Sequence, residues 1–275
     1  MKTRIIVAVI FLPLIFIVLF FLPPYVLTGL ISLVSAIAAY EMLHSLWGKG
    51  IDRVRIYTTF SAALIPIGAY FEITALVFPA VTLALMCLLF TEAILVFKTI
   101  RKITFQNILI ALFAGAIIPL MLSSLVSLKL MPEGRFFVLL PIISAFLTDA
   151  GAYFTGLGLG KKKVFPLVSP KKTVEGCIGG LAVGTTAILI YGAILVFTTF
   201  HSVVFWALAL YGVIGAVITQ LGDLSFSLIK REFDIKDYGR LIPGHGGMLD
   251  RFDSMVFAAP AMYLLVTAFP AIIVK

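Results

Sequence analysis

The chain has 275 residues, of which 61% are hydrophobic and only 12% are charged, and its formal net charge is +8. Soluble domains carry about a quarter charged residues, so this chain has too little polar surface to fold as a water-soluble globule. The two cysteines, Cys87 and Cys177, each lie inside an apolar run and support neither a disulfide framework nor a thiolate metal site.

A helix needs about 20 apolar residues to cross about 30 Å of hydrocarbon. Nine stretches meet this requirement: Ile5–Phe21, Tyr25–Trp47, Ile56–Ile73, Thr74–Phe97, Ile103–Leu125, Phe136–Leu157, Gly176–Thr198, Val203–Ile229 and Asp253–Val274. The first follows Lys2 and Arg4 as in a signal peptide, but it ends in Pro23-Pro24 without a small-x-small cleavage site, so we expect a transmembrane helix. The third and fourth are separated only around Glu72–Thr74, which makes that boundary the weakest.

The expected fold is an all-α polytopic membrane bundle. Backbone polar groups cannot stay unpaired in lipid, and the alternating ten-residue pattern of a barrel is missing from the sequence. We expect one integral membrane unit, with about five N-terminal helices in residues 1–130 and a catalytic region in residues 131–275 that carries two basic cytoplasmic loops.

The basic residues predict the orientation. If the N-terminus is cytoplasmic, all but three of the 21 Lys and Arg residues fall on the cytoplasmic side, the exceptions being Lys129, Arg135 and Lys275. The positive-inside rule demands such a bias, and miscounting one helix would scramble it. We therefore expect nine helices, a C-terminus outside, and a multi-pass protein of the cell membrane with its active site facing the cytoplasm.

Two expected cytoplasmic segments, Gly158–Glu175 and Lys230–Arg251, are rich in Lys, Gly, Pro and Asp. Asp223 precedes Lys230 by seven residues, so it lies about 10 Å below the basic surface along a helix axis. A lone carboxylate at that depth costs roughly 2.5–3.5 kcal/mol on insertion scales. It is either half of a structural ion pair or a functional group.

The second segment ends in a glycine-rich run around His245, with Gly246 and Gly247 beside it. Glycines let the backbone approach a ligand and present its N–H groups to an anion. Asp250 and Asp253 are three residues apart at the start of the last helix, so they share a face. Helix capping explains one of them well. Two, together with the buried Asp223, favour a site for one or two hard cations such as Mg²⁺.

The first segment contains Lys161–Lys163 and a Ser-Pro-Lys-Lys-Thr run from Ser169 to Thr173. Such lysines often set topology or touch anionic lipid. Beside glycine-rich backbone and carboxylates they also indicate a phosphate site. Asp149 is a further acid within the membrane and is expected to face the same cavity, whereas Glu41 and Glu92 are interpreted as contacts inside helices.

These residues resemble the phosphatidate cytidylyltransferases, or CDP-diacylglycerol synthases. The family signature of 27 positions is matched in register by Ser227, Lys230, Arg231, Lys236, Asp237, Gly239, Ile242, Pro243, His245, Gly246, Gly247, Asp250, Arg251 and Asp253. The run Ser169–Gly176 and the acidic position Asp149 are similar to the family as well. Many relatives carry an acid just before the signature serine, where this chain has Phe226.

The resemblance implies transfer of CMP from CTP to phosphatidic acid, giving CDP-diacylglycerol and pyrophosphate with Mg²⁺. Our hypothesis is that Asp223, Asp250 and Asp253 bind the metal. The catalytic residues would be these three acids together with Lys230, Arg231, Lys236, His245 and Arg251. The substrate-binding residues would be Ser169, Lys171, Lys172, Thr173, Gly246, Gly247 and Asp149. The expected partners are CTP, phosphatidic acid and membrane lipid, with no nucleic acid and with a homodimer as a plausible assembly.

Two other functions remain open at this point. Acids within the membrane also mark the ion pathways of secondary transporters, although these acids gather at one face and no inverted repeat is evident in the sequence. A different transferase or kinase acting on a lipid phosphate or alcohol is the closer rival. The acidic motif of the CDP-alcohol phosphatidyltransferases is not found in the sequence.

Overall fold

The computed structural model describes residues 17–47, 52–98, 102–199, 202–241 and 246–273. They form two compact units. Unit 1 comprises Met1–Leu130 and Ile235–Phe252, and unit 2 comprises Met131–Asp234 and Asp253–Lys275. Within the described ranges the chain is almost entirely helical, as expected, and six of its helical segments are long and apolar enough to cross a membrane.

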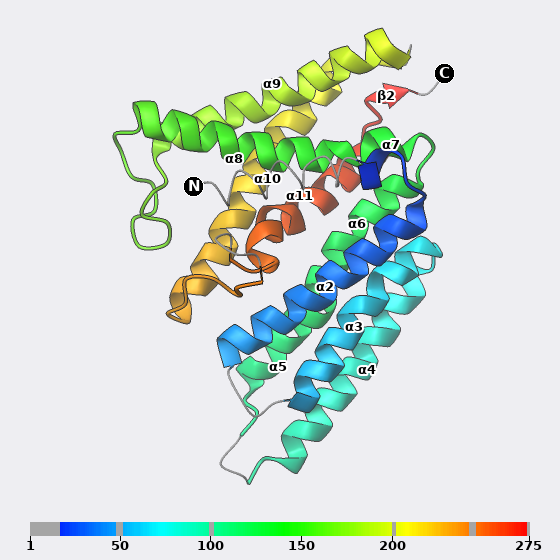
Figure 1. Cartoon of the computed structure of the whole chain (residues 1–275), viewed down its shortest axis with the longest axis vertical. Coiled ribbons are helices and arrows are strands. Elements are labelled where there is room, and N and C mark those ends of the chain that lie inside the picture. Colours follow the sequence, from blue (N-terminus) through cyan, green and yellow to red (C-terminus); the bar gives the residue numbers. More distant parts are fainter. Residues whose placement is uncertain (1–16, 48–51, 99–101, 200–201, 242–245, 274–275) are drawn as a thin grey trace. The chain divides into compact units, whose positions relative to one another are not determined.

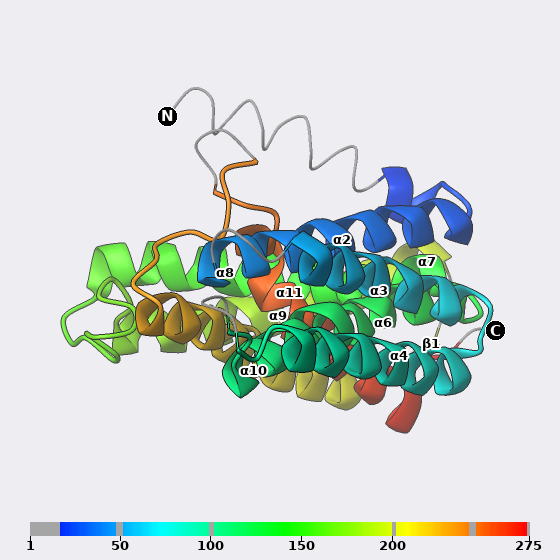
Figure 2. The same cartoon turned by 90° about the horizontal axis from the view of Figure 1, so that it is seen from below.

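Unit 1 is built from the N-terminal helices (Figure 1). They are α2 (Pro24–Trp47), α3 (Asp52–Tyr70), α4 (Thr74–Leu95) and a long segment in which α5 (Phe105–Leu112), the π-helical turn η1 (Phe113–Ile117) and α6 (Ile118–Leu130) follow one another. Helix α3 packs against α2, α4 and α6 (Figure 2). The weak boundary after α3 is a real turn, with Glu72 in the left-handed region at φ 59°. Most of the predicted span Ile5–Phe21 lies outside the described residues. Within the described part of that span, residues 17–20 are helical.

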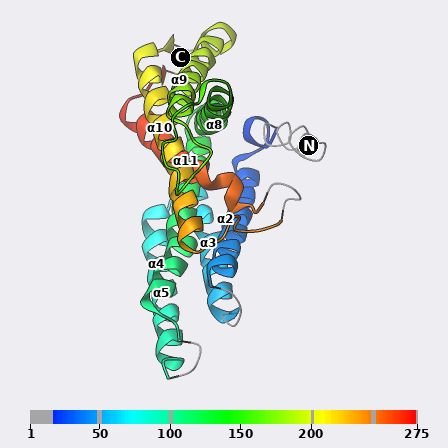
Figure 3. The same ribbon diagram turned by 90° about the vertical axis from the view of Figure 1, so that its left-hand side faces the viewer.

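Unit 2 contains the short helix α7 (Gly134–Phe137) followed by three long helices (Figure 3). These are α8 (Leu139–Leu159), α9 (Val174–Thr199) and α10 (Phe205–Glu232). Glycines let α8 and α9 approach closely: a Cβ on Gly151 would lie 2.6 Å from Cβ of Val183, and one on Gly180 would lie 2.8 Å from the carbonyl oxygen of Thr148. Small residues at helix contacts are the usual means of packing within a membrane.

Helix α11 (Leu249–Ala268) begins and ends earlier than the predicted stretch Asp253–Val274. Beyond it, β2 (Ile272–Ile273) pairs antiparallel with β1 (Ser202–Val203), which lies between α9 and α10. The prediction of helix at Val203 and at Ile272–Ile273 was therefore wrong. Apolar runs predict burial in lipid but do not distinguish a helix end from a two-residue strand whose backbone groups pair with each other.

The segment Ile235–Phe252, which holds most of the glycine-rich motif, belongs to unit 1 with the N-terminal helices. Hydropathy alone could not indicate this, because the segment is polar and far from those helices in sequence. The division of function between residues 1–130 and 131–275 stays a prediction.

Candidate active site

Five of the predicted site residues come together in unit 2. Nζ of Lys172 lies 2.7 Å from Oδ2 of Asp223, and Nζ of Lys230 lies 4.0 Å from Oδ2 of Asp253. Asp149 and Asp253 are both close enough to Asp223 for their charges to repel. We call Asp149, Lys172, Asp223, Lys230 and Asp253 the polar cluster. Three carboxylates and two ammonium groups among apolar helices leave one net negative charge.

Two residues that the sequence analysis missed support the polar cluster. The Ser254 hydroxyl lies 3.1 Å from Oδ2 of Asp149 and 3.4 Å from Oδ1 of Asp253, and its backbone N–H donates to the same Asp253 oxygen at 2.7 Å. The backbone carbonyl of Gln220 accepts from Lys172 at 3.4 Å, while its side-chain amide donates to the Cys177 carbonyl at 3.2 Å. The sequence around Gln220 and Ser254 does not distinguish them from other glutamine and serine residues within helices. The only signal for Ser254 is its position next to Asp253.

The loop between α8 and α9 is ordered by its backbone and by unit 2 side chains. Backbone N–H groups of Lys161 and Lys162 donate to Oε2 of Glu175, and Lys163 forms an isolated antiparallel bridge with Thr173. In the middle of the loop, the Val168 carbonyl accepts a hydrogen bond from Nε of Arg231 at 3.3 Å. Arg231, a predicted catalytic residue, thus holds this loop against the last turn of α10.

Thr173, a predicted substrate-binding residue, is buried and caps α9. Its hydroxyl oxygen accepts from the Gly176 N–H at 3.1 Å, the bond that an N-cap makes to the third residue of a helix. Replacing Thr173 with alanine should therefore cost about 1 kcal/mol of stability. The measurement is the thermal unfolding midpoint in detergent, where Thr173→Ala should fall by a few degrees and Thr173→Ser should match the parent. A stable Thr173→Ala protein would contradict the capping role.

In unit 1 the glycine-rich segment is tied down by Asp250. Its Oδ2 atom accepts from the backbone N–H groups of Tyr238 at 2.9 Å and Gly247 at 3.0 Å, and Tyr238 is fully buried. Gly246 has φ +84°, a backbone conformation that favours glycine. Asp250 thus organises the segment in this structure, and its part as a metal ligand stays a prediction.

Glu41 of α2 lies under the same segment. It is 6% exposed, and its Oε2 atom accepts from the Leu249 N–H, the first of α11, at 2.9 Å. A Cβ on Gly239 would lie 2.3 Å from one carboxylate oxygen and a Cβ on Gly247 2.4 Å from the other. A larger side chain at either position would push the Glu41 carboxylate out of its place, because the segment wraps around it. Glu41 is thus a contact inside the helix, as predicted, but its partner on α11 does not follow from the sequence.

The remaining predicted residues have simpler positions. Lys171, Lys236 and Arg251 are exposed, and Ser169 is half-buried. His245 lies outside the described residues. Phe226, at the position where many relatives carry an acid, is fully buried and packs edge-to-face on Phe257 at 6.4 Å. That position serves the core of unit 2 rather than a ligand.

Within the described ranges, no three His, Cys, Asp or Glu side chains gather as a metal-binding group. The chemistry of the polar cluster nevertheless fits a hard divalent cation, because its acids supply oxygen ligands and outnumber its two ammonium groups. Asp223 and Asp253 are the residues of unit 2 that would hold such an ion.

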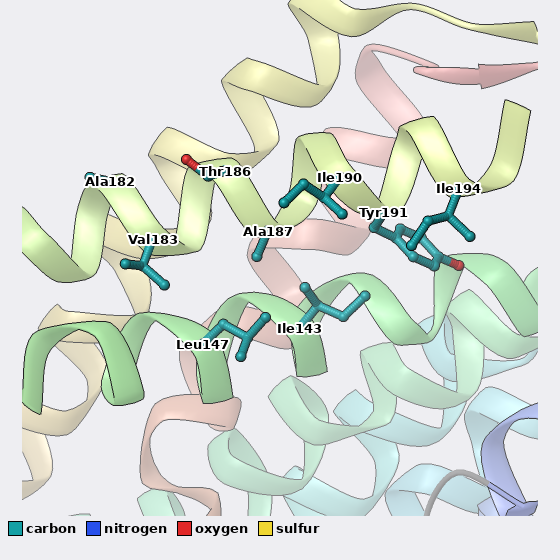
Figure 4. Close-up of a pocket in the computed structure, with 9 residues that line it drawn as sticks. All are labelled: Ile143, Leu147, Ala182, Val183, Thr186, Ala187, Ile190, Tyr191 and Ile194. Atoms are coloured by element: carbon teal, nitrogen blue, oxygen red, sulfur yellow. The ribbon is translucent and has the colours of Figure 1, made fainter. Parts of the chain in front are cut away.

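Unit 2 also has an apolar groove of about 530 Å³ along α8 and α9, lined by residues such as Leu147, Val183 and Ile190 (Figure 4). Leu147 and Asp149 are two residues apart on α8 and therefore point about 200° apart around the helix axis. The groove thus opens on a different face of α8 from the polar cluster.

The sequence is similar to proteins of a known family. Residues 2–269 match the sequence model described as the cytidylyltransferase family. Proteins named phosphatidate cytidylyltransferase from Staphylococcus saprophyticus and Staphylococcus haemolyticus are each 43% identical over 133 residues, and one from Staphylococcus aureus is 44% identical over the same length. Each match covers 48% of this chain and 50% of the relative, so the chain spans about half the length of the curated relatives it matches.

Proposed function

This chain belongs to the cytidylyltransferase family, and from that membership we propose that it makes CDP-diacylglycerol and pyrophosphate from CTP and phosphatidic acid. The similar staphylococcal proteins are named for the same activity. The observation that carries the proposal is the polar cluster, where Lys172 pairs with Asp223 and Lys230 faces Asp253 between apolar helices.

The chemistry suits this set of residues. An oxygen of the phosphatidic acid phosphate attacks the α-phosphorus of CTP, and the bond from that phosphorus to the bridging oxygen breaks to release pyrophosphate. A phosphomonoester is mostly dianionic at neutral pH, since its second pKa is about 6, so no strong general base is required. The obstacle is repulsion between two anions. Lys172 and Lys230 would lower it by neutralising phosphate charge at fixed positions.

A bound Mg²⁺ would polarise the phosphates and stabilise the departing pyrophosphate. We propose Asp223 and Asp253 as its ligands, with Asp250 as the third and Asp149 in support. Lys171, Arg231, Lys236 and Arg251 would add positive charge along the substrates, and the backbone of Gly246–Gly247 would offer N–H groups to a phosphate.

The membrane topology is also a proposal. We propose nine spans with the N-terminus in the cytoplasm, because that arrangement places all but three of the basic residues inside. The six candidate spans among the described residues support a multi-pass protein. The site would then face the cytoplasm of the cell membrane, where CTP is available and the lipid need not leave the bilayer. We propose a homodimer as the assembly.

The test is an assay of the full chain in sealed proteoliposomes. With radiolabelled CTP and phosphatidic acid, we expect labelled lipid and an equal amount of pyrophosphate when Mg²⁺ is present, and neither product when the metal is chelated. Titrating Mg²⁺ at fixed CTP would show whether one or two ions are needed. Solute flux without CTP consumption would instead identify a transporter and overturn the proposal.

A further inference from the structure

The loop between α8 and α9 has an apolar tip surrounded by lysines. Phe165 is 46% exposed and Leu167 is 90% exposed. Lys161, Lys162 and Lys163 precede the tip, Lys171 follows it, and all four lysines are exposed. Large apolar side chains presented among cations form a pattern typical of surfaces that bind the headgroup region of anionic membranes.

The tip is held in place. Val164 donates its N–H to the Lys172 carbonyl at 3.2 Å, and Val174 donates to the Lys162 carbonyl at 2.8 Å, which closes the base of the loop. The contact from Arg231 to Val168 then fixes the part beside the tip to the end of α10. In Figure 1 the loop extends downward from the left-hand end of α8, and the C-terminal end of α10 also points toward the lower left. The exposure of Leu167 therefore belongs to an anchored loop.

The neighbouring helix ends place the loop at the edge of the hydrocarbon. Leu157 and Leu159, in the last turn of α8, are 72% and 66% exposed, and Ile178, in the second turn of α9, is 62% exposed. Both helices are apolar enough to span a membrane, and side chains exposed on such helices would face lipid. The hydrocarbon region would then reach the last turn of α8, with the loop starting at the level of the lipid headgroups.

We propose that this loop docks on the leaflet at its own side of the membrane, with Phe165 and Leu167 inserted between headgroups and with Lys161, Lys162 and Lys163 on anionic lipid phosphates. The partner is an anionic lipid bilayer. A second part of the proposal rests on the proposed function: because the same loop ends in Lys172 of the polar cluster, docking gathers the anionic lipid substrate beside the site.

The insertion is tested by a spin label at Leu167→Cys in the full chain, with Cys87 and Cys177 replaced by alanine. The matched control is a label at Glu232→Cys, at the exposed end of α10 on the same side. In nanodiscs with phosphatidylglycerol we expect the Leu167 label to collide several-fold more with lipid-soluble oxygen, relative to an aqueous nickel complex, than the control label does. Equal collision ratios at the two sites would overturn the docking.

The gathering of substrate is tested by kinetics on mixed vesicles. A Phe165→Ser, Leu167→Ser double variant and a Lys161→Gln, Lys162→Gln, Lys163→Gln triple variant should each raise the KM for phosphatidic acid, expressed as mole fraction, several-fold. Their kcat and KM for CTP should match the parent. An unchanged lipid KM would overturn this second part. Failure of the proposed function would appear differently, as a parent protein that makes no product while the spin-label result stands.

Discussion

Asp253→Asn should lower the rate of CDP-diacylglycerol formation by about 100-fold or more, the loss typical when one preorganised electrostatic group is removed from a reacting centre. Asp253 is 8% exposed and lies opposite Lys230 in the polar cluster. Asparagine keeps the size of the side chain and one oxygen that can accept from Ser254, but it removes the charge that would hold a cation. The measurement is the initial rate with radiolabelled CTP and phosphatidic acid over a range of Mg²⁺ concentrations.

Asp223→Asn should have a similar effect. Lys172 would lose its charged partner, which lies 2.7 Å away, and the cation would lose a ligand. The matched control is Asp234→Asn. Asp234 is exposed just after α10 with φ 52°, a conformation that asparagine adopts readily, so this change should leave the rate within twofold. If the Asp253 and Asp223 variants keep their thermal midpoints and turn over at the control rate, the carboxylates do not serve the reaction.

The helices could be predicted from sequence because lipid imposes one simple rule on them. A run of apolar residues long enough to cross the bilayer must be helical, so α2, α4, α9 and α10 were placed to within a few residues of their observed ends. The rule does not extend to the polar ends of the spans. The start of α11 at Leu249 depends on the Glu41 carboxylate, and the strands at Ser202–Val203 and Ile272–Ile273 depend on each other.

The candidate site could be predicted in its residue types but not in its partners. Acids within apolar helices are costly, so Asp149, Asp223 and Asp253 stand out in the sequence. Their pairing with Lys172 and Lys230 could not be predicted, since helix periodicity relates residues only within one helix. The least predictable contact joins Glu41 to Leu249 across 208 positions. A glutamate inside a helix does not indicate which distant backbone it will bind.

Glu41→Ala should weaken the glycine-rich segment and lower activity at least tenfold. Truncation leaves the buried Leu249 N–H without its acceptor, which costs about 1–3 kcal/mol, and removes the group around which Gly239 and Gly247 pack. Glu41→Gln should keep most of the activity, because its amide oxygen can still accept from Leu249 and its volume is unchanged. Thermal unfolding and initial rates on the same preparations measure both effects. Glu92→Ala is the matched control, since Glu92 of α4 contacts Arg53 and Tyr57 of α3.

A second substitution separates this packing from general destabilisation. Gly247→Ala places a Cβ within 2.4 Å of the Glu41 carboxylate, so the carboxylate must shift and its bond to the Leu249 N–H must weaken, and the single variant should lose activity. In a Glu41→Ala background the obstructing oxygen is gone, and adding Gly247→Ala should cause little further loss. Two groups in contact give such non-additive effects, whereas distant sites give additive ones. Additive losses would mean that the glycine is required for a reason other than Glu41, and the carboxylate would then be a support for α11 alone.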